Sequence, residues 1–410
     1  MVSFLYFLET KITKRLLPQL RQMPQPIPKR IKENKPELCK QTFNTLLVDG
    51  SNILELSSLG DKTISSSGTE IGGIFQFFLQ LKILLQKGNF RYVYVFWDGN
   101  NSGNLRYNLN KEYKLNRDKE FEDDDLSDYM KEVNKKISNM YSYFKKKQKD
   151  PVKLAEQKKH KEIFYWQRDI IMEMLEELFI RQCVCDKTEA DDFIGYYVSH
   201  KKDNERIVIV SNDRDLTQLI SEDVIVYVQS LKTFVNTKNH TDIMGYNYQN
   251  VVLKKILCGD ASDNIKGIKG LGEKTLFNNF EEIKKRKVTL EEVIEKASKI
   301  NEQRISEKKK PLKWAENIVN KVTDGCQGEK IYDINEKIID LHNPLMTDEA
   351  KEVIEGMMYA PIDPTDRTME NLYNIIVKYD IDTLKDTTTF GNFFSEFMYL
   401  IDKEKKNLPI

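Results

Sequence analysis

The sequence predicts an α/β fold with a parallel sheet at its core, followed by a helical C-terminal region. Short apolar runs at Thr45–Asp49, Arg91–Asp98 and Arg206–Ser211 are typical of strands that are buried on both faces. Helical patterns separate these runs, the first of them around Ile74–Gln86. Strands that alternate with helices form parallel sheets covered by helices on both faces, so we expect that architecture here.

Changes in composition divide the chain into three predicted parts. Residues 1–42 carry nine Lys or Arg against three Glu, and closely spaced prolines interrupt any helix, which predicts a loosely ordered basic extension. Residues 43–250 contain the predicted strands, together with a highly charged helical excursion at 100–161. Residues 251–410 are expected to be helical, with a lysine-rich stretch from Glu281 to Lys313.

Composition excludes several classes of protein. The 410 residues hold 64 Lys or Arg and 64 Asp or Glu, so net charge gives no indication of nucleic-acid binding, and the distribution of charge has to be examined instead. No apolar run approaches the roughly 18 residues of a membrane span. The short apolar start, Val2–Leu8, lacks the length of a secretory signal. Five scattered cysteines favour a reducing compartment, so we expect a cytoplasmic location and no secretion.

Acidic residues gather where the predicted strands end. They are Asp49, Asp98, Glu189, Asp191, Asp192, Asp213, Asp215, Asp260 and Asp263. Asp49 and Asp98 end the first two strands, while Glu189 opens a helix for which Thr188 is a candidate N-cap. Because the carboxyl ends of neighbouring parallel strands meet at one edge of a sheet, we expect these side chains to converge there.

Converging carboxylates need counter-charge, because their mutual repulsion would otherwise raise their pKa values. Few Lys or Arg residues lie at these strand ends in the sequence, and Mg²⁺ prefers carboxylate and water oxygens. Two ions about 4 Å apart would clamp the attacking water and the leaving oxygen of a phosphodiester. A single Asp at a strand end is more often a cap than a ligand, but the joint pattern predicts two or more Mg²⁺ ions, with Mn²⁺ suited to the same oxygens.

A glycine-rich turn follows the last acids. Gly267, Gly270 and Gly272 allow a tight turn between two short helices, and Lys274 and Thr275 lie at the start of the second helix. Glycines let backbone N–H groups approach a phosphate closely, and a helix N-terminus adds a favourable dipole. The pattern therefore predicts a helix-hairpin-helix element that holds a duplex backbone; the alternative is an ordinary glycine-rich connection.

These residues together resemble the flap endonuclease and 5′-to-3′ exonuclease family, and within it most closely the bacteriophage flap endonucleases and the phage ribonuclease H that removes primers. The matching segments are Leu47–Gly50, Phe96–Asp98, Glu112–Arg117, Glu189–Asp192, Asp213–Asp215 and Gly259–Asn264, with the glycine-rich turn after them. They occur in the family's order between about residues 45 and 280. The C-terminal third resembles phage members only faintly, and the first 42 residues match nothing.

The resemblance implies roles for the acids and for the charged excursion. Asp49, Asp98, Glu189, Asp191, Asp213 and Asp215 would hold the catalytic ions. Asp192, Asp260 and Asp263 would hold a second, weaker ion or orient its waters. The excursion at 100–161 would be the helical arch, near which a 5′ single strand passes. Lys114 and Arg117 would contact the scissile phosphate, with Arg106, Lys111 and Tyr113 adding phosphate contacts and base stacking. The alternative for this basic group is a solvated helix face.

The function implied is hydrolysis of phosphodiesters near the 5′ ends of flaps, nicked duplexes or RNA–DNA primers. Two alternatives remain: an RNA-directed nuclease of the related single-domain type, and a catalytically idle DNA-binding scaffold. The hairpin argues against the first, and the complete set of acids argues against the second. The resemblance also implies a monomer and a single-stranded DNA-binding protein as partner. Thr387–Phe394 is expected to be a core-facing aromatic stripe rather than a sliding-clamp peptide, because the Gln of such peptides is missing.

Overall fold

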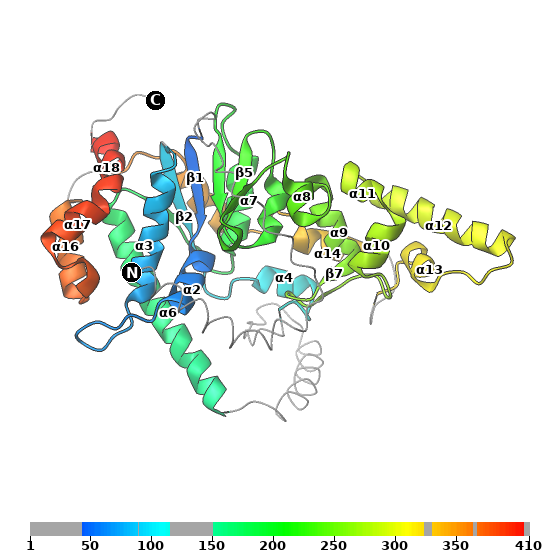
Figure 1. Cartoon of the computed structure of the whole chain (residues 1–410), viewed down its shortest axis with the longest axis horizontal. Coiled ribbons are helices and arrows are strands. Elements are labelled where there is room, and N and C mark those ends of the chain that lie inside the picture. The colour runs from blue at the N-terminus through cyan, green and yellow to red at the C-terminus, as the bar shows by residue number, and fades with distance from the viewer. Residues whose placement is uncertain (1–42, 89, 115–150, 324–329, 364–366, 406–410) are drawn as a thin grey trace, which may run out of the picture. The chain divides into compact units, whose positions relative to one another are not determined.

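A computed structural model describes residues 43–88, 90–114, 151–323, 330–363 and 367–405 (Figure 1). The predicted basic extension at 1–42, most of the predicted arch and Arg117 lie outside the described residues. The rest is built on a six-stranded sheet with the order β3-β2-β1-β4-β5-β6. Its strands are β1 (Thr45–Asp49), β2 (Tyr92–Phe96), β3 (Arg181–Cys183), β4 (Ile207–Val210), β5 (Val224–Val228) and β6 (Thr233–Val235).

Five of the six strands run parallel, and β1 lies in the middle. It pairs with β2 on one side, where Asp49 lies opposite Phe96, and with β4 on the other, where Val48 lies opposite Val210. Chain order runs outward from β1 in both directions, so the sheet reverses its winding between β1 and β4. In open α/β sheets the ligand crevice lies beyond the carboxyl ends of the strands at such a point.

The apolar strand residues alternate between two hydrophobic cores. Val48 of β1 and Val95 of β2 face one core, while Leu47 and Phe96 of the same strands face the other. Successive side chains of a strand point to opposite faces, so a continuous apolar run buries a sheet on both sides. The alternation explains why β2 and β4 are built from apolar and aromatic residues alone.

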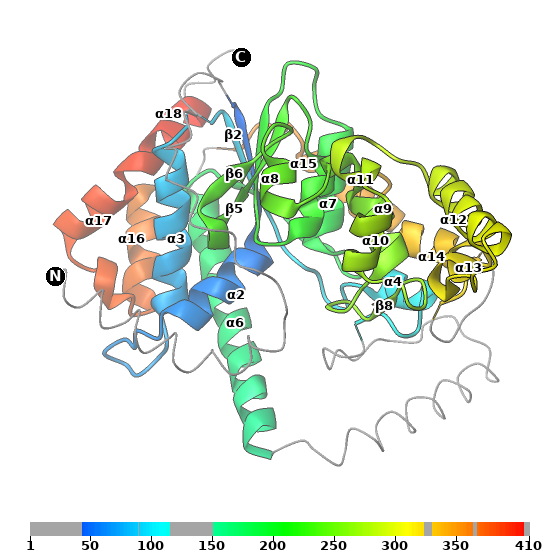
Figure 2. The same cartoon turned by 45° about the vertical axis from the view of Figure 1, so that its right-hand side comes forward.

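The first core lies between the sheet and a layer of helices that includes the C-terminal end of the described chain. Its early helices are α2 (Gly50–Gly60), α3 (Gly72–Leu85) and α6 (Pro151–Glu177). Its late helices are α16 (Met369–Lys378), α17 (Thr387–Phe394) and α18 (Met398–Lys405), with the 3₁₀ turns Asp382–Leu384 and Ser395–Phe397. The late helices lie beside α3, as Figures 1 and 2 show. Residues about 300 positions apart thus share one core.

The second core lies against the opposite face of the sheet. It contains residues of α7 (Ala190–Ser199), the 3₁₀ helix η3 (Arg214–Leu219), α8 (His240–Met244) and α15 (Asp348–Met357). Gly195 of α7 packs on the backbone of Leu341, since a Cβ at Gly195 would lie 2.3 Å from that carbonyl oxygen. Close approach of this kind fixes the segment around Leu341 onto α7.

A third core holds together a set of short helices beside the sheet (Figure 2). They are α9 (Val251–Cys258), α10 (Glu273–Asn279), α11 (Glu282–Lys285), α12 (Leu290–Ser306), α13 (Lys313–Val319) and α14 (Lys330–Ile339). Between α9 and α10 the chain forms the two-stranded hairpin of β7 (Gly259–Asp260) and β8 (Ile265–Lys266). The short helix α4 (Asn104–Leu109) and Tyr113 contact this part of the molecule.

The predicted fold class is confirmed: a mostly parallel sheet with helices on both faces and a helical C-terminal region. The predicted strands and the helix around Ile74–Gln86 are present. Strands β5 and β6 were not predicted, because a short apolar run cannot be told from a buried helix segment by periodicity alone, and β6 has only three residues. The predicted boundary at residue 250 does not divide the packing, since Leu341 and Phe394 lie in the cores of the sheet.

The aromatic stripe on α17 faces the core, as expected. Phe394 is fully buried, and Phe390 and Phe393 are also buried. The ring of Phe394 makes an edge-on contact with Phe78 of α3 at 5.9 Å between centroids. A sliding-clamp peptide would have to expose these rings. Within the described ranges, no helix is both long and apolar enough to span a bilayer.

Replacing Phe394 by Ala should lower the free energy of unfolding by about 3–5 kcal/mol, because the substitution leaves a cavity between α3 and α17. Urea denaturation followed by circular dichroism measures the change. Val377→Ala on neighbouring α16 is the control, since Val377 is 48% exposed. A loss below about 1 kcal/mol for Phe394→Ala would contradict the assignment of α17 to the core.

Candidate metal centre

The first group of acids lies where β1, β2 and β4 end. Asp49 is the last residue of β1, and its carboxylate caps α2 by accepting from the Asn52 amide at 3.0 Å. Asp98 lies two residues beyond β2, and its backbone amide donates a hydrogen bond to the Ser51 hydroxyl at 2.8 Å. Asp213 follows β4 and caps η3 by accepting from the Asp215 amide at 2.8 Å. The strand ends therefore bring these acids together, as the sequence predicted.

Ser211 links two of these acids and was not predicted from the sequence. Its hydroxyl donates to Asp49 at 2.8 Å and accepts from the Asp213 amide at 3.0 Å. It is fully buried at the end of β4. Only its place between a strand and an Asp-x-Asp segment could have pointed to it. Its contacts fix the orientation of the Asp49 carboxylate.

The start of α7 supplies the next acids. Glu189 is the N-cap residue, and Asp191 and Asp192 lie in the first turn. The prediction that Thr188 caps this helix is wrong. Asp98 does so across the sheet, since its carboxylate accepts from the Ala190 amide at 2.9 Å. Negative charge is favoured at a helix N-terminus, so the helix helps to hold acids from two different strands.

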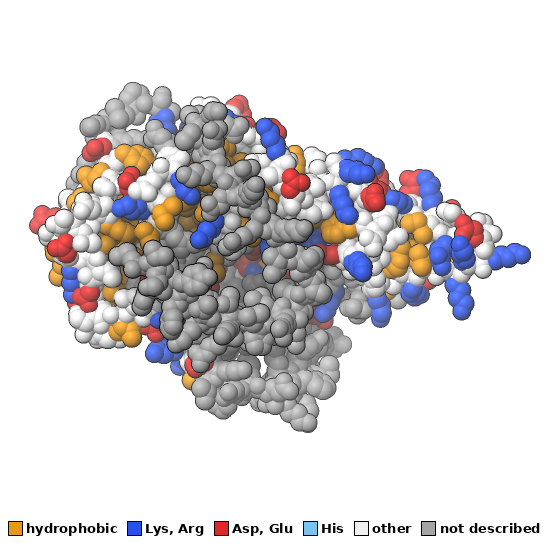
Figure 3. Space-filling view, viewed as in Figure 1, with side chains coloured by type: hydrophobic (Ala, Val, Ile, Leu, Met, Phe, Trp, Pro, Cys, Tyr) orange, Lys and Arg blue, Asp and Glu red, His pale blue; other side chains and the backbone are white. Residues whose placement is uncertain are grey.

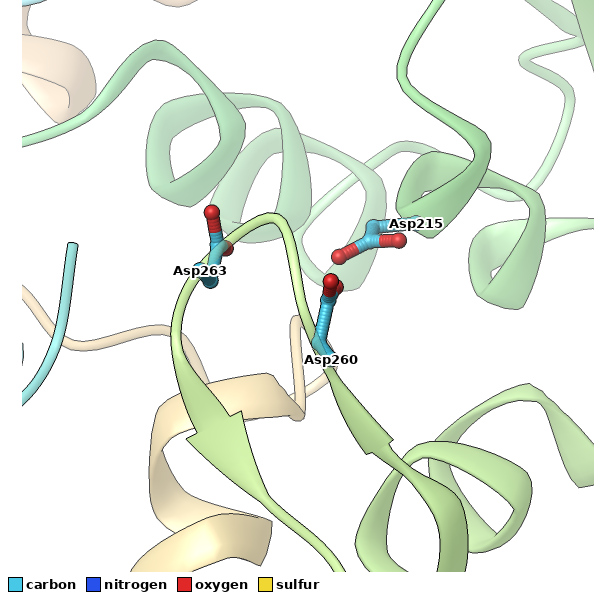
Figure 4. A group of neighbouring side chains, drawn as sticks. All are labelled: Asp215, Asp260 and Asp263. Atoms are coloured by element: carbon cyan, nitrogen blue, oxygen red, sulfur yellow. The ribbon is translucent and has the colours of Figure 1, made fainter. Parts of the chain in front are cut away.

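Three further carboxylates form a cluster of their own (Figure 4). Asp215 comes from η3, Asp260 from β7 and Asp263 from the loop between β7 and β8. One oxygen of each lies within 4.8 Å of the others, which is a spacing that could hold a cation. The cluster joins the edge of the sheet to the β7–β8 hairpin.

Lys255 of α9 pairs with two of these carboxylates. Its ammonium group lies between Asp215 and Asp260 and contacts both. The sequence analysis missed it, because it lies in an apolar helix and only folding brings it to η3. Burial would raise the pKa of Asp260, yet Lys255 and the hydrogen bonds from Ser262 hold that pKa well below its ordinary value.

Arg106 is also buried, contrary to the expectation that it contacts phosphate from an exposed face. Its guanidinium makes two hydrogen bonds to Asp192, at 2.6 and 2.7 Å, and one to Glu189 at 2.9 Å. Its Nε donates to the carbonyl of Ile338 at 2.9 Å. Asp192, predicted to serve a second ion, thus has an arginine against both oxygens. In this structure Arg106 organises acids and has little capacity left for a phosphate.

Tyr113 and Lys114 approach Glu189 from another side. The Tyr113 hydroxyl donates to Glu189 at 3.1 Å, and Lys114 pairs with it at 2.6 Å. Tyr113 is 2% exposed, so base stacking on its ring does not fit this arrangement. Lys114 has a positive φ of 52°, an uncommon conformation that aims it at the site, and its amide donates to the Asp263 carbonyl at 2.9 Å. Lys111 lies farther out, 4.3 Å from the centre of the Tyr107 ring.

The centre thus contains two kinds of carboxylate. Glu189, Asp192, Asp215 and Asp260 are paired with the buried cations Arg106, Lys114 and Lys255. Asp49, Asp98, Asp191 and Asp213 make no ion pair with any residue in the described part of the chain. Of these four, Asp49 is buried and the other three are partly buried. Carboxylates shielded from water without a counter-ion are costly, so this second set is the one that a bound cation would complete.

The pKa values of the buried acids reflect this crowding. Burial and the Asp98 charge raise the pKa of Asp49 to about 7. Burial, then Asp213 and Asp49, raise the pKa of Asp191 well above its ordinary value. Burial and Asp213 raise the pKa of Asp215 to about 6, against the opposing charge of Lys255. Hard divalent cations bind carboxylate oxygens and would hold these groups ionised, so the donor set fits divalent ions.

A small pocket opens among these residues. It is lined by Arg106, Tyr113, Lys114, Glu189, Asp191, Asp215, Asp263, Ile265, Ile338, Ile339 and Leu341. Polar groups with strongly shifted pKa values, converging in a concave site, are characteristic of functional centres.

The predicted phosphate-binding turn lies beyond β8, and its glycines differ in role. A Cβ at Gly267 would lie 2.3 Å from the backbone of Cys258, so Gly267 is needed for close packing on α9. Gly270 has a φ of +79°, a conformation that favours glycine. Gly272 is the N-cap residue of α10. Gly270, Gly272 and Lys274 are exposed, and Thr275 is partly exposed in the first turn of α10.

Comparison with known proteins places this geometry in a family. Residues 44–252 match the model of the 5′-3′ exonuclease N-terminal resolvase-like domain. The chain is 37% identical over 135 residues to a 5′-3′ exonuclease of Mycoplasmopsis pulmonis. The aligned region covers 32% of this chain and 45% of that protein. It is 36% identical over 121 residues to a 5′-3′ exonuclease of Bacillus subtilis, and this match covers 28% of this chain and 40% of that protein. The matches therefore span less than half the length of these curated relatives.

Solved structures agree on the fold. A bacteriophage T5 protein co-crystallised with metal ions aligns with a TM-score of 0.50 at 16% identity, covering 87% of this chain and 99% of that one. A complex of the bacteriophage T5 flap endonuclease with DNA and metal ions gives a TM-score of 0.51, also at 16% identity. This alignment covers 88% of this chain and 99% of that one. At this identity the likeness shows a common fold. The match over residues 44–252 shows the family: the chain belongs to the 5′-3′ exonucleases, as a member of their N-terminal resolvase-like domain family.

Proposed function

We propose that this protein is a metal-dependent 5′ nuclease that hydrolyses phosphodiesters near the 5′ ends of flaps, nicked duplexes or RNA–DNA primers. The observation that carries the proposal is the set of acids without a counter-ion: Asp49, Asp98, Asp191 and Asp213. Asp49, Asp98 and Asp213 lie at the carboxyl ends of β1, β2 and β4, where the sheet reverses its winding, and Asp191 lies in the first turn of α7. A purely structural centre would neutralise them with Lys or Arg, as the neighbouring acids are neutralised. The similarity to 5′-3′ exonucleases and to a flap endonuclease supports the same activity.

Two or more Mg²⁺ ions, or Mn²⁺ in their place, are the proposed cofactors. Asp49, Asp98, Asp191 and Asp213, with Glu189, would hold one ion, and Asp215, Asp260 and Asp263 would hold another. Bound divalent ions supply an activated water and charge stabilisation for phosphodiester hydrolysis. Asp192 would act through Arg106 rather than as a ligand, because both its oxygens face that guanidinium.

Lys114 is the proposed catalytic cation within the described chain. It lies on the wall of the pocket, beside Glu189 and Asp191, and is almost completely buried. An ammonium group held there would stabilise negative charge that develops on a phosphate. Arg117 is proposed for the same phosphate by family resemblance, and Lys111 for the strand that leads to it.

The exposed turn beyond β8 would bind the duplex. The backbone N–H groups at Gly270 and Gly272 and the side chains of Lys274 and Thr275 can contact phosphates without reading bases. A monomeric protein and a single-stranded DNA-binding partner are further proposals that follow from the family resemblance. A cytoplasmic location is proposed from the scattered cysteines.

Asp213→Asn should reduce cleavage of a 5′-labelled flap substrate by more than about 100-fold. Replacing a residue that only orients a metal ligand lowers activity by about 10–100-fold, so replacing a ligand itself should lower activity further. The amide oxygen can still accept from the Asp215 backbone, so the fold should persist. Cleavage is measured with Mg²⁺ and with EDTA. Asp223→Asn is the control, since Asp223 lies at the start of β5 and pairs with Arg206. If the full-length wild-type protein bound the flap DNA but did not cut it with Mg²⁺ or Mn²⁺, the catalytically idle scaffold would be favoured instead.

Divalent ions should stabilise the protein more at about pH 8 than at about pH 5. The folded-state pKa values of Asp49 and Asp215 are raised to about 7 and about 6, so the folded protein binds more protons than the unfolded chain between about pH 4 and pH 7. Metal-free stability therefore falls as the pH rises through that window. Thermal melting with and without Mg²⁺, at matched ionic strength, tests this. An equal Mg²⁺ effect at both pH values, or an unchanged effect in Asp49→Asn, would contradict it.

Arg106→Lys should lower turnover by about 10–100-fold, because lysine keeps the charge but cannot hold Asp192 and Glu189 at the same time. The half-saturating Mg²⁺ concentration should rise as well, while DNA affinity in EDTA stays within about twofold. Arg181→Lys is the matched control, since Arg181 is also buried but bonds to the Ala360 carbonyl. If DNA affinity fell and the Mg²⁺ dependence did not change, Arg106 would be a phosphate contact after all.

A further inference from the structure

A strongly basic segment ends the pair of helices α12 and α13. We call residues 304–313 the basic tip; it contains Arg304, Lys308, Lys309, Lys310 and Lys313 against a single acid, Glu307. The whole chain is balanced in charge, but the stretch from Lys266 to Lys321 holds 15 Lys or Arg against 9 Asp or Glu. The excess of positive charge is therefore local, and Figure 3 shows Lys and Arg side chains gathered on this part of the surface.

The basic tip is a folded connection. The Asn301 side chain accepts from the Leu312 amide at 2.7 Å and donates to the Leu312 carbonyl at 3.2 Å. Arg304 donates to the Lys310 carbonyl at 2.9 Å. These contacts close the turn between α12 and α13 and fix where its lysines are presented, so a ligand would not have to order the segment first.

The lysines of the basic tip are free to meet a ligand. The side chains of Lys309 and Lys313 are 59% and 82% exposed, and they pair only with their near neighbours Glu307 and Glu316. Exposed ion pairs of this kind contribute little to stability, so these lysines can readily leave their carboxylate partners for another anion. Lys308 and Lys310 are exposed and make no ion pair with any described residue.

The basic tip is attached to the proposed phosphate-binding turn. Trp314, next to Lys313, lies against Gly270, since a Cβ at Gly270 would be 4.0 Å from that of Trp314. The Lys269 amide donates to the Val322 carbonyl at 2.9 Å, and Asn317 donates to the Lys269 carbonyl at 2.7 Å. The turn and the helix pair thus move as one body. Figures 1 and 2 both show α13 beside α10.

We propose that the basic tip binds the phosphate backbone of the duplex beyond the part held by the turn, and so lengthens the DNA footprint. This rests on the proposed function, in which the turn holds a duplex. The 17 residues of α12 span about 25 Å, which corresponds to about seven base pairs of B-DNA. The basic tip has no aromatic side chain on which single-stranded bases could stack, which favours a duplex backbone as its ligand.

The test compares two triple variants of the full chain. Lys308→Gln, Lys309→Gln and Lys310→Gln together neutralise the basic tip. Lys238→Gln, Lys351→Gln and Lys378→Gln together remove the same charge from helices α15 and α16 and the loop before α8. Affinity for flap DNA is measured in EDTA, where no cutting occurs, over a range of salt concentrations and with duplex arms of about 6 and about 20 base pairs.

On the long arm, the tip variant should bind about tenfold more weakly than wild type, and its plot of log affinity against log salt should be shallower by about 2 to 3. On the short arm the two proteins should bind alike, and the control triple should match wild type throughout. A tip variant that equals the control on both arms would overturn the proposal and make the basic tip a solvated face. Cleavage is scored separately: absence of cutting by wild type, with length-dependent binding intact, would refute the nuclease proposal alone.

Discussion

The structure depends on one electrostatic constraint, which is that nine acidic side chains meet in a small volume at the carboxyl edge of the sheet. Their repulsion has to be offset, and the fold offsets only part of it. Arg106, Lys114 and Lys255 neutralise the acids nearest α4, α9 and the start of α7. The acids at the ends of β1, β2 and β4 keep their oxygens for another cation. The donor set of the centre therefore suits divalent ions, and burial and the Asp98 charge raise the pKa of Asp49 to about 7.

The C-terminal part of the chain belongs to this centre. The Ile338 carbonyl accepts from Arg106, and the Leu345 amide donates to Asp192 at 3.1 Å. Gln218 of η3 bonds to both the Ile339 carbonyl and the Leu341 amide. A short backbone segment thus contacts α4, which carries Arg106, and two elements that carry acids, α7 and η3. This explains why the helices after residue 330 pack onto the sheet instead of forming a separate body, and why the site cannot be separated from the C-terminal region.

The cluster of Asp215, Asp260 and Asp263 would connect the proposed metal centre to the proposed DNA-binding turn. Asp215 belongs to the sheet, whereas the other two belong to the hairpin that leads into the exposed turn and the helices α10–α13. A cation held by all three would tie the position of the duplex to the reacting phosphate. Proximity and orientation account for a large share of catalysis in phosphoryl transfer, so a rigid connection of this kind would help to position the substrate for cleavage.

The sequence by itself determined the parallel sheet, the acids at the ends of its strands and the glycine-rich turn, because each depends on local periodicity or on residues close together in the chain. It did not determine which acids are neutralised. Arg106 meets Asp192 and Ile338, and Lys255 meets Asp215, only after distant segments pack together. Tyr113, expected to stack on bases, and Arg106, expected to hold phosphate, became buried partners of Glu189 for the same reason. Burial and long-range ion pairing are properties of the tertiary structure, and they decide which carboxylates remain for metal.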